Sequence, residues 1–160
     1  MAKKEGAVAF LREWTVHYVK NKDILTRKIE SITEQGEDSI LVKAKDREQL
    51  YLIRPFVKDM QGALAGLKKE NSVNIVLCNT PDNFNAMLKA WESLIAFPKL
   101  TIIFVNPFSQ LDTKWVLIPH THDLISERES LKLGLKTMFE MVEPTNEEEF
   151  ARRIASASEE

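Results

Sequence analysis

The sequence has few of the residues and patterns on which several protein classes depend. Its one cysteine, Cys78, cannot form a disulfide within the chain, which favours a reducing, cytoplasmic location. No apolar run approaches the roughly 18 residues that a membrane-spanning helix needs, so we expect no membrane segment. None of the five glycines belongs to a dinucleotide-binding or P-loop pattern, and no G-x-S-x-G elbow is present. We therefore expect no cofactor.

What is present is typical of a soluble α/β protein. With 160 residues, 44% of them hydrophobic, the chain has enough material for one domain spanning residues 1–160. From residue 140 to the end there are seven acidic and two basic residues, a local charge of −5. Because the whole chain carries −2, the preceding residues carry +3, which leaves room for a local basic patch but predicts no strong nucleic-acid binding. Residues 156–160 are predicted to be a disordered tail.

Two short apolar runs, 73–78 and 100–105, are predicted to be strands buried on both faces of a sheet. The segment between them has helical spacing: Thr80 is a suitable cap, Pro81 suits the first helical position, and Pro98 ends the helix. Phe84 and Trp91 fall on the apolar face of this segment and are expected in the core. Together the three elements predict a βαβ unit.

The rest of the chain adds elements on either side of this unit. Helices are predicted at 7–19 and 59–70, and capping boxes at Ser126/Glu129 and Thr145/Glu148 predict two more near the end. Strands are predicted at 24–33, 39–45, 49–57 and 115–118, although 24–33 is also compatible with a helix. Pro55 belongs at the end of its strand or on an edge. The fold class is α/β, with a central mixed sheet, helices on both faces and the order α-βββ-α-β-α-β-β-α-α.

This order of elements over residues 8–142 resembles the PD-(D/E)xK, or restriction-endonuclease-like, nuclease superfamily, in its resolvase and Mrr-like branch. The segment DSILVKAKDREQLYLIRPF resembles the catalytic hairpin of that family, and ALAGLKKENSVNIVLCNTPDNFNAMLKAWESL the helix-strand-helix that follows it. The resemblance implies a metal site in which an acid of the second strand meets a Glu-x-Lys on the third, and the carboxylates hold Mg²⁺.

Only part of that site is present in this sequence. Asp38 stands at the position of the first acid, but the third strand reads LYLIRP, without a carboxylate or a lysine. Glu48 comes too early in the strand to replace them. We therefore expect a nuclease-like fold that has lost the catalytic motif and serves as a binding or assembly module, with Asp38 as a turn residue and only a weak catalytic candidate. The alternative is a metal-dependent nuclease whose carboxylates have migrated, drawing on Asp38, Glu30 or Glu48.

Two further groups of residues are candidates for other sites. His120, His122 and Asp123 lie within four residues at the end of a strand and supply three metal-ligand side chains, but a solvated loop before a helix explains them equally well. The polar residues after the two buried strands, Asn79, Thr80 and Asn106, are instead where a Rossmann-like domain would bind a small ligand.

Lys43, Lys45 and Arg47 form the one compact basic strip on a predicted exposed face. We expect any nucleic-acid contact to be made here and to be weak. Otherwise the chain is expected to bind a protein partner or a second copy of itself.

Overall fold

A six-stranded mixed sheet forms the centre of the fold in the computed structural model, which describes residues 2–158 and the side chains of residues 6–157. The strands lie in the order β1-β2-β3-β4-β5-β6. β4 runs parallel to both β3 and β5, and the other neighbouring pairs are antiparallel. The predicted α/β class with a mixed sheet is therefore confirmed. The strands are β1 Ile29–Glu34, β2 Ser39–Ala44, β3 Glu48–Ile53, β4 Val73–Cys78, β5 Leu100–Val105 and β6 Lys114–Leu117.

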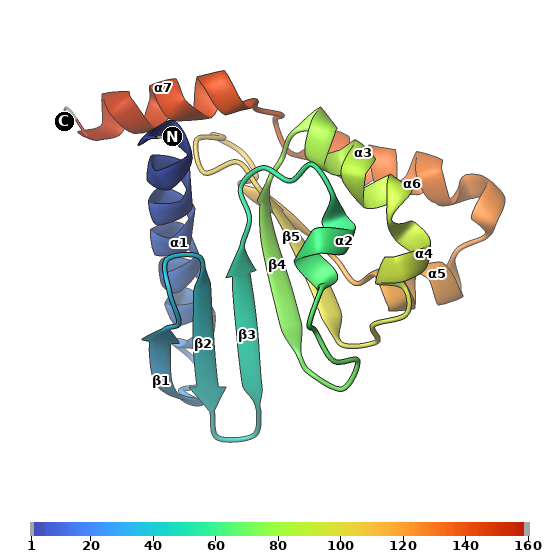
Figure 1. The fold of residues 1–160 in the computed structure, drawn as a ribbon, viewed down its shortest axis with the longest axis horizontal. Coiled ribbons are helices and arrows are strands. Elements are labelled where there is room, and N and C mark those ends of the chain that lie inside the picture. Colours follow the sequence, from blue (N-terminus) through green and yellow to red (C-terminus); the bar gives the residue numbers. More distant parts are fainter. Residues whose placement is uncertain (1, 159–160) are drawn as a thin grey trace.

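Helices cover both faces of this sheet (Figure 1). On one face α1 packs against the strands and against α7, and both helices contribute to one buried apolar cluster. On the other face α2, α3, α4 and α6 contribute to a second cluster, and α5 lies beside α4 and β5. No helix within residues 2–158 is both long and apolar enough to cross a membrane. The helices are α1 Ala2–Asp23, α2 Met60–Leu64, α3 Pro81–Lys89, α4 Trp91–Leu94, α5 Pro119–Ile125, α6 Arg128–Met141 and α7 Glu147–Ser158.

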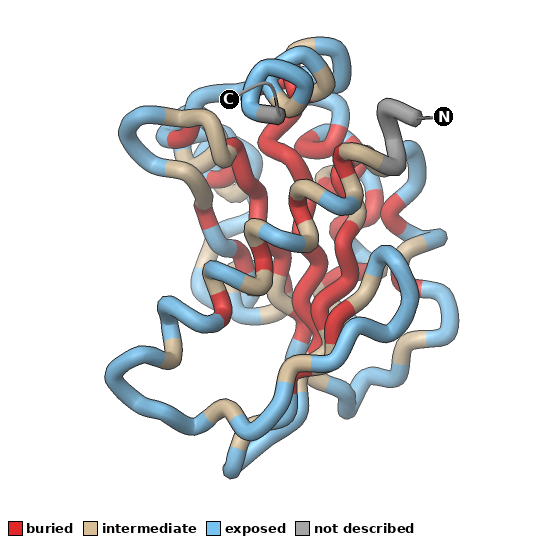
Figure 2. Tube along the Cα trace, turned by 90° about the vertical axis from the view of Figure 1, so that its left-hand side faces the viewer, coloured by how far each residue is buried: buried red, intermediate tan, exposed pale blue. Residues whose placement is uncertain are grey.

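The predicted βαβ unit is the most buried part of the molecule. Every residue of β4 is buried, because its side chains alternate between the two apolar clusters, as expected for a strand covered on both faces. Figure 2 shows this burial concentrated along the central strands. Thr80 caps α3 by accepting a hydrogen bond from the backbone N–H of Asn83, and Pro81 is the first helical residue. The sequence signals for this unit are confirmed.

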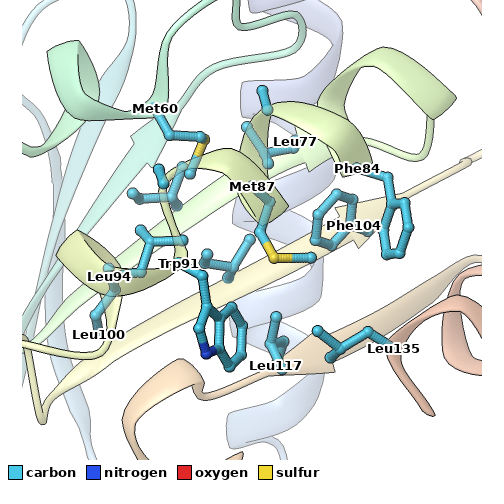
Figure 3. Close-up of a cluster of buried hydrophobic side chains, with 14 of the residues drawn as sticks. Met60, Leu77, Phe84, Met87, Trp91, Leu94, Leu100, Phe104, Leu117 and Leu135 are labelled. Carbon is cyan, nitrogen blue, oxygen red and sulfur yellow. The ribbon is translucent and has the colours of Figure 1, made fainter. Parts of the chain in front are cut away.

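Trp91 and Phe84 are buried in the cluster on the α3 side, as their helical spacing predicts (Figure 3). The Trp115 indole stacks on the Phe104 ring at a centroid distance of 4.4 Å, which joins β6 to β5 on the same face. The helix that carries Trp91 is not continuous, however. It is interrupted at Ala90, which gives α3 and α4 in place of the single predicted helix.

Several predicted boundaries differ from the structure. The helix expected at 59–70 is only Met60–Leu64, and Gly66 then adopts a positive φ of 81°, a left-handed conformation that ends it. The first strand begins at Ile29 instead of residue 24, and Pro55 follows β3, in agreement with its predicted place at a strand's end.

The two predicted capping boxes are not formed. α6 begins at Arg128 without a side-chain cap. For α7 the backbone N–H of Glu149 donates to Asn146 Oδ1 at 2.8 Å, so Asn146 takes the capping role predicted for Thr145. α7 continues to Ser158 and includes residues 156–158 of the predicted tail, and residues 159 and 160 lie outside the described part of the chain.

Candidate functional site

Asp38, the carboxylate that the nuclease resemblance points to, is paired with an arginine. Arg54 Nη1 lies 3.0 Å from Asp38 Oδ2 and also donates to the main-chain oxygens of Asp38 and Ile53. The antiparallel pairing of β2 and β3 brings these residues together, because the start of one strand lies beside the end of the other. A cation at this place would have to displace the guanidinium group, which already neutralises the carboxylate.

The other acids considered for a migrated metal site lie elsewhere. Glu48 opens β3 whereas Arg54 follows its end, and six strand residues span about 20 Å. Glu30 stands at the start of β1, which pairs with the far end of β2 from Asp38. The fold therefore does not bring Asp38, Glu30 and Glu48 together. Among the described residues no group of three or more His, Cys, Asp or Glu side chains is placed to hold a metal ion.

The histidine-rich segment belongs to a helix, α5, and not to the predicted loop. His120 Nδ1 lies 2.8 Å from the carbonyl oxygen of Ile95. Asp123 Oδ1 accepts a hydrogen bond of 3.0 Å from Trp91 Nε1 and lies 3.4 Å from Arg128 Nε. Two of the three proposed ligands thus fasten α5 to the end of α4 and to α6. These contacts give His120 and Asp123 a structural role.

Buried asparagine side chains lie at the carboxyl ends of the parallel strands, and their amides form hydrogen bonds within the protein. Asn79 is fully buried, and its Nδ2 donates to the carbonyl oxygens of Val142 at 2.9 Å and Phe139 at 3.3 Å. Its Oδ1 accepts from Trp115 Nε1 at 2.8 Å, and its main-chain oxygen accepts from Thr145 N–H. One side chain therefore holds α6 and the segment after it against β6.

Asn83 and Asn106 act in the same way on either side of Asn79. Asn83 Nδ2 donates to the carbonyls of Pro55 and Cys78. Asn106 Nδ2 donates to the carbonyl of Glu143 at 2.7 Å. A ligand at the predicted Rossmann-like position would have to replace these internal hydrogen bonds. Asn83 is the member that sequence reasoning missed, although its place three residues after the capping Thr80 could have drawn attention to it.

The basic strip lies at the opposite end of the sheet, on the β2–β3 hairpin. Lys43, Lys45 and Arg47 are all exposed, and Lys43 pairs across the strands with Glu48. β2 ends at Ala44, so Lys45 projects from the turn and not from the strand on which it was predicted.

The C-terminal end of α1 and the connection to β1 add further cations beside this hairpin (Figure 1). We use the name basic end for this group, which consists of Lys20, Lys22, Arg27, Lys28, Lys43, Lys45 and Arg47. Four acids accompany it, Asp23, Glu30, Asp46 and Glu48, so the region has a net charge of +3.

Asp23 has a defined structural role at the basic end. Its carboxylate accepts hydrogen bonds from the backbone N–H groups of Lys28 and Ile29, at 2.8 and 3.1 Å, and from the Thr26 hydroxyl. Desolvation acts to raise the pKa of Asp23, but these hydrogen bonds and the charge of Lys28 outweigh it, and the pKa lies below its usual value. Asp46, in turn, lies 3.6 Å from Lys28. Two of the four acids are thus already engaged within the protein.

Comparisons with protein-family models, with curated proteins and with solved structures give no match for this chain. A functional assignment therefore depends on the contacts and charges described above.

Proposed function

We propose that this chain is a non-catalytic binding module on a nuclease-like scaffold, and that it contacts the phosphate backbone of nucleic acid with its basic end. The observation that carries the proposal is the convergence of α1, the start of β1 and the β2–β3 hairpin, which gathers seven cations at one end of the molecule. Exposed lysine and arginine side chains that are free to move are the usual means of binding phosphates without reading sequence.

The pairing of Asp38 with Arg54 supports binding over cleavage. In a metal-dependent nuclease the carboxylate at this place would hold Mg²⁺. Here a guanidinium group contacts the carboxylate and the carbonyl beside it at 3.0 Å. The nuclease-like character of the scaffold remains a prediction from the order of its elements.

The arrangement of charge in the molecule also favours binding at the basic end. The acids of α7, Glu147, Glu148 and Glu149, lie at the opposite end of the sheet from the hairpin (Figure 1). The length of β3 alone separates the two ends by about 20 Å, roughly twice the Debye length at 0.1 M salt. At that ionic strength the acids of α7 therefore have little effect on a phosphate chain at the basic end.

The expected affinity is low and depends on salt. If the basic strip neutralises about three phosphates, the slope of log K against log salt is roughly −2 to −3, with single strands at the shallower end. Such binding is lost near physiological ionic strength unless two copies of the chain bind the same strand.

A fluorescence-anisotropy titration at low salt tests the proposal, with labelled single-stranded and duplex oligonucleotides. The double variant Lys43→Glu, Lys45→Glu is expected to bind at least tenfold more weakly than the wild type. The matched control is Lys132→Glu, Lys136→Glu, which reverses two exposed lysines on α6, away from the basic end. Equal weakening by both pairs, or no effect of the first, would contradict the proposed surface.

A cleavage assay with the same oligonucleotides and Mg²⁺ or Mn²⁺ tests the absence of catalysis. No cleavage is expected from the wild type. Cleavage that is abolished by Asp38→Asn would instead support the nuclease alternative.

A further inference from the structure

A cleft of about 230 Å³ opens at the basic end, between the last turn of α1 and strands β1 to β3. Its lining is mixed: Val19 from α1 and Val42 and Ala44 from β2 are apolar, and Asp23, Lys28, Asp46 and Gln49 are among the polar residues. Lys22 and Arg47 lie on its lining together with Tyr51, which is buried. The cleft thus combines a small apolar interior with a charged rim, the usual composition of a small-molecule site.

The charged groups of this rim are unequally engaged. Asp23 is held by its three hydrogen bonds, and Asp46 lies beside Lys28. Within residues 6–157 the Arg47 guanidinium makes no hydrogen bond or ion pair, and Lys22 contacts only the face of the Tyr18 ring, at 5.6 Å. Both remaining cations are therefore available to an anionic group at the mouth of the cleft.

A second observation concerns polar groups in the sheet next to the cleft. Asn74 of β4 is only 5% exposed, and its Nδ2 has no hydrogen-bond partner in the described part of the chain. In the register of the parallel strands Asn74 pairs with Tyr51, which lines the cleft. A buried amide N–H without an acceptor is uncommon and costly in folded proteins, but Asn74 itself is not among the residues that line the cleft.

Tyr51 lies on the lining of the cleft, where its hydroxyl can contact a ligand. Burial, together with the neighbouring Tyr18, raises the pKa of Tyr51 to about 12, while Arg47 acts in the opposite direction. The phenol is therefore protonated at neutral pH and is a hydrogen-bond donor. The interior of the cleft consequently presents the Tyr51 hydroxyl as a donor, whereas its charged lining consists of three cations, Lys22, Lys28 and Arg47, and two acids, Asp23 and Asp46.

We propose that this cleft binds a single nucleotide unit, with the phosphate between Lys22 and Arg47 and the base against the apolar residues of the walls, its carbonyl oxygen toward Tyr51. This inference rests on the proposed function, because it takes the basic end to be a nucleic-acid surface. The unit is either a free mononucleotide or an unstacked nucleotide of a single strand, since both offer the same phosphate and base. A base in a stacked duplex cannot enter the cleft.

The test is an NMR titration of the full chain with uridine 5′-monophosphate, ribose 5-phosphate and inorganic phosphate. The mononucleotide is expected to shift backbone signals of residues 42–51 and to bind at least tenfold more tightly than ribose 5-phosphate. Equal affinities for the two would show an anion-binding rim without a base site, and would overturn the proposal. No binding of the mononucleotide would also overturn it.

Variants identify the site. Ala44→Leu fills the apolar interior and is expected to abolish mononucleotide binding, and Arg47→Gln is expected to weaken it about tenfold by removing a charge-assisted hydrogen bond. Lys136→Gln on α6 is the control for loss of one positive charge. If Ala44→Leu destabilises the fold, Arg47→Gln still tests the proposal, because Arg47 is exposed. Wild-type mononucleotide affinity in Arg47→Gln would contradict the proposed phosphate position.

The two proposals fail separately. Suppose that the mononucleotide binds to the wild type but not to Ala44→Leu, and that anisotropy detects no binding of a strand. This result would support the cleft as a mononucleotide site and refute the proposed phosphate-backbone surface. Strand binding that depends on Lys43 and Lys45, without any mononucleotide binding, would support the backbone surface and refute the mononucleotide site. If both occur, competition by the mononucleotide against a single strand shows whether the strand inserts a nucleotide, and competition against a duplex is expected to be absent.

Discussion

Replacing Asn79 by aspartate tests whether the polar groups at the carboxyl ends of the parallel strands bond within the protein or are accessible to a ligand. In the wild type the amide donates to two carbonyl oxygens and accepts from the Trp115 indole, with no exposure to solvent. An aspartate has the same shape but, when ionised, turns an acceptor toward both carbonyls. We therefore expect a strong and pH-dependent loss of stability.

The magnitude follows from the burial of the new carboxyl group. A carboxylate enclosed among acceptors has its pKa raised by several units, so at neutral pH the folded state keeps a proton that the unfolded state releases near pH 3.9. With the folded pKa above the unfolded one, stability is fully present below about pH 4 and is lost as the pH rises. At 1.36 kcal/mol per pH unit, the loss between pH 4 and 7 is about 4 kcal/mol. About 1 kcal/mol more is lost at all pH values, because a protonated carboxyl donates only one hydrogen bond.

Urea unfolding between pH 4 and 7 measures this effect, with Asn85→Asp as the matched control. Asn85 lies on the exposed side of α3, so the same substitution there is expected to change stability by less than about 0.5 kcal/mol at every pH. If the Asn79 variant behaved like the Asn85 variant, the amide would have to face solvent. The carboxyl ends of β4 and β5 would then be available to a ligand, as in the Rossmann-like alternative.

Two further substitutions test the core and the basic end. Trp91→Ala removes the largest side chain of α4 from the cluster between α3 and the sheet and is expected to cost about 3–5 kcal/mol in denaturant titration; a loss below about 1 kcal/mol would place that helix face in solvent. Asp23→Asn should be less stable than the wild type at neutral pH. Because the pKa of Asp23 is lowered in the folded state, this difference in stability should shrink as the pH falls below about 4, and it should vanish once the carboxyl group of the folded protein is protonated. A difference that persisted unchanged to pH 2 would show that the carboxylate hydrogen bonds are not its source.

The central strands could be predicted from sequence to the residue, because the information that defines them is local. Two apolar runs of six residues leave no other place for a buried strand, and Thr80 and Pro81 mark the helix start between them. α2 was overestimated because the apolar spacing continues past Gly66, where the backbone turns left-handed. α5 was missed because residues 120–123 were interpreted as a loop after a strand, whereas the proline before them, Pro119, is suited to the first turn of a helix.

The candidate sites were less predictable, because they depend on contacts between distant parts of the chain. Nothing near Asn79 in the sequence indicates that its amide binds carbonyls about 60 residues later, at Phe139 and Val142. The absence of a Glu-x-Lys motif on the third strand was visible, but the pairing of Arg54 with Asp38 requires the strand register. The cleft at the basic end is formed by α1 and a hairpin that share no local pattern.

The cleft exists because of the way in which the chain leaves α1. α1 ends at Asp23 and β1 begins at Ile29, so five residues must reverse the direction of the chain. Arg27 adopts a left-handed conformation with a φ of 48°. This conformation is energetically unfavourable for residues other than glycine. The Asp23 carboxylate offsets this cost by accepting from the two backbone N–H groups that follow Arg27. The reversal brings Lys28 and Ile29 to the mouth of the cleft, while Val19 and Lys22 remain on the other wall. The same carboxylate that fixes the turn also lies on the lining of the cleft, together with Lys22 and Arg47. The amides at the ends of the parallel strands bond within the protein, and Asp38 is held by Arg54. Lys22 and Arg47, which make no ion pair within residues 6–157, are therefore the strongest basis for a ligand site.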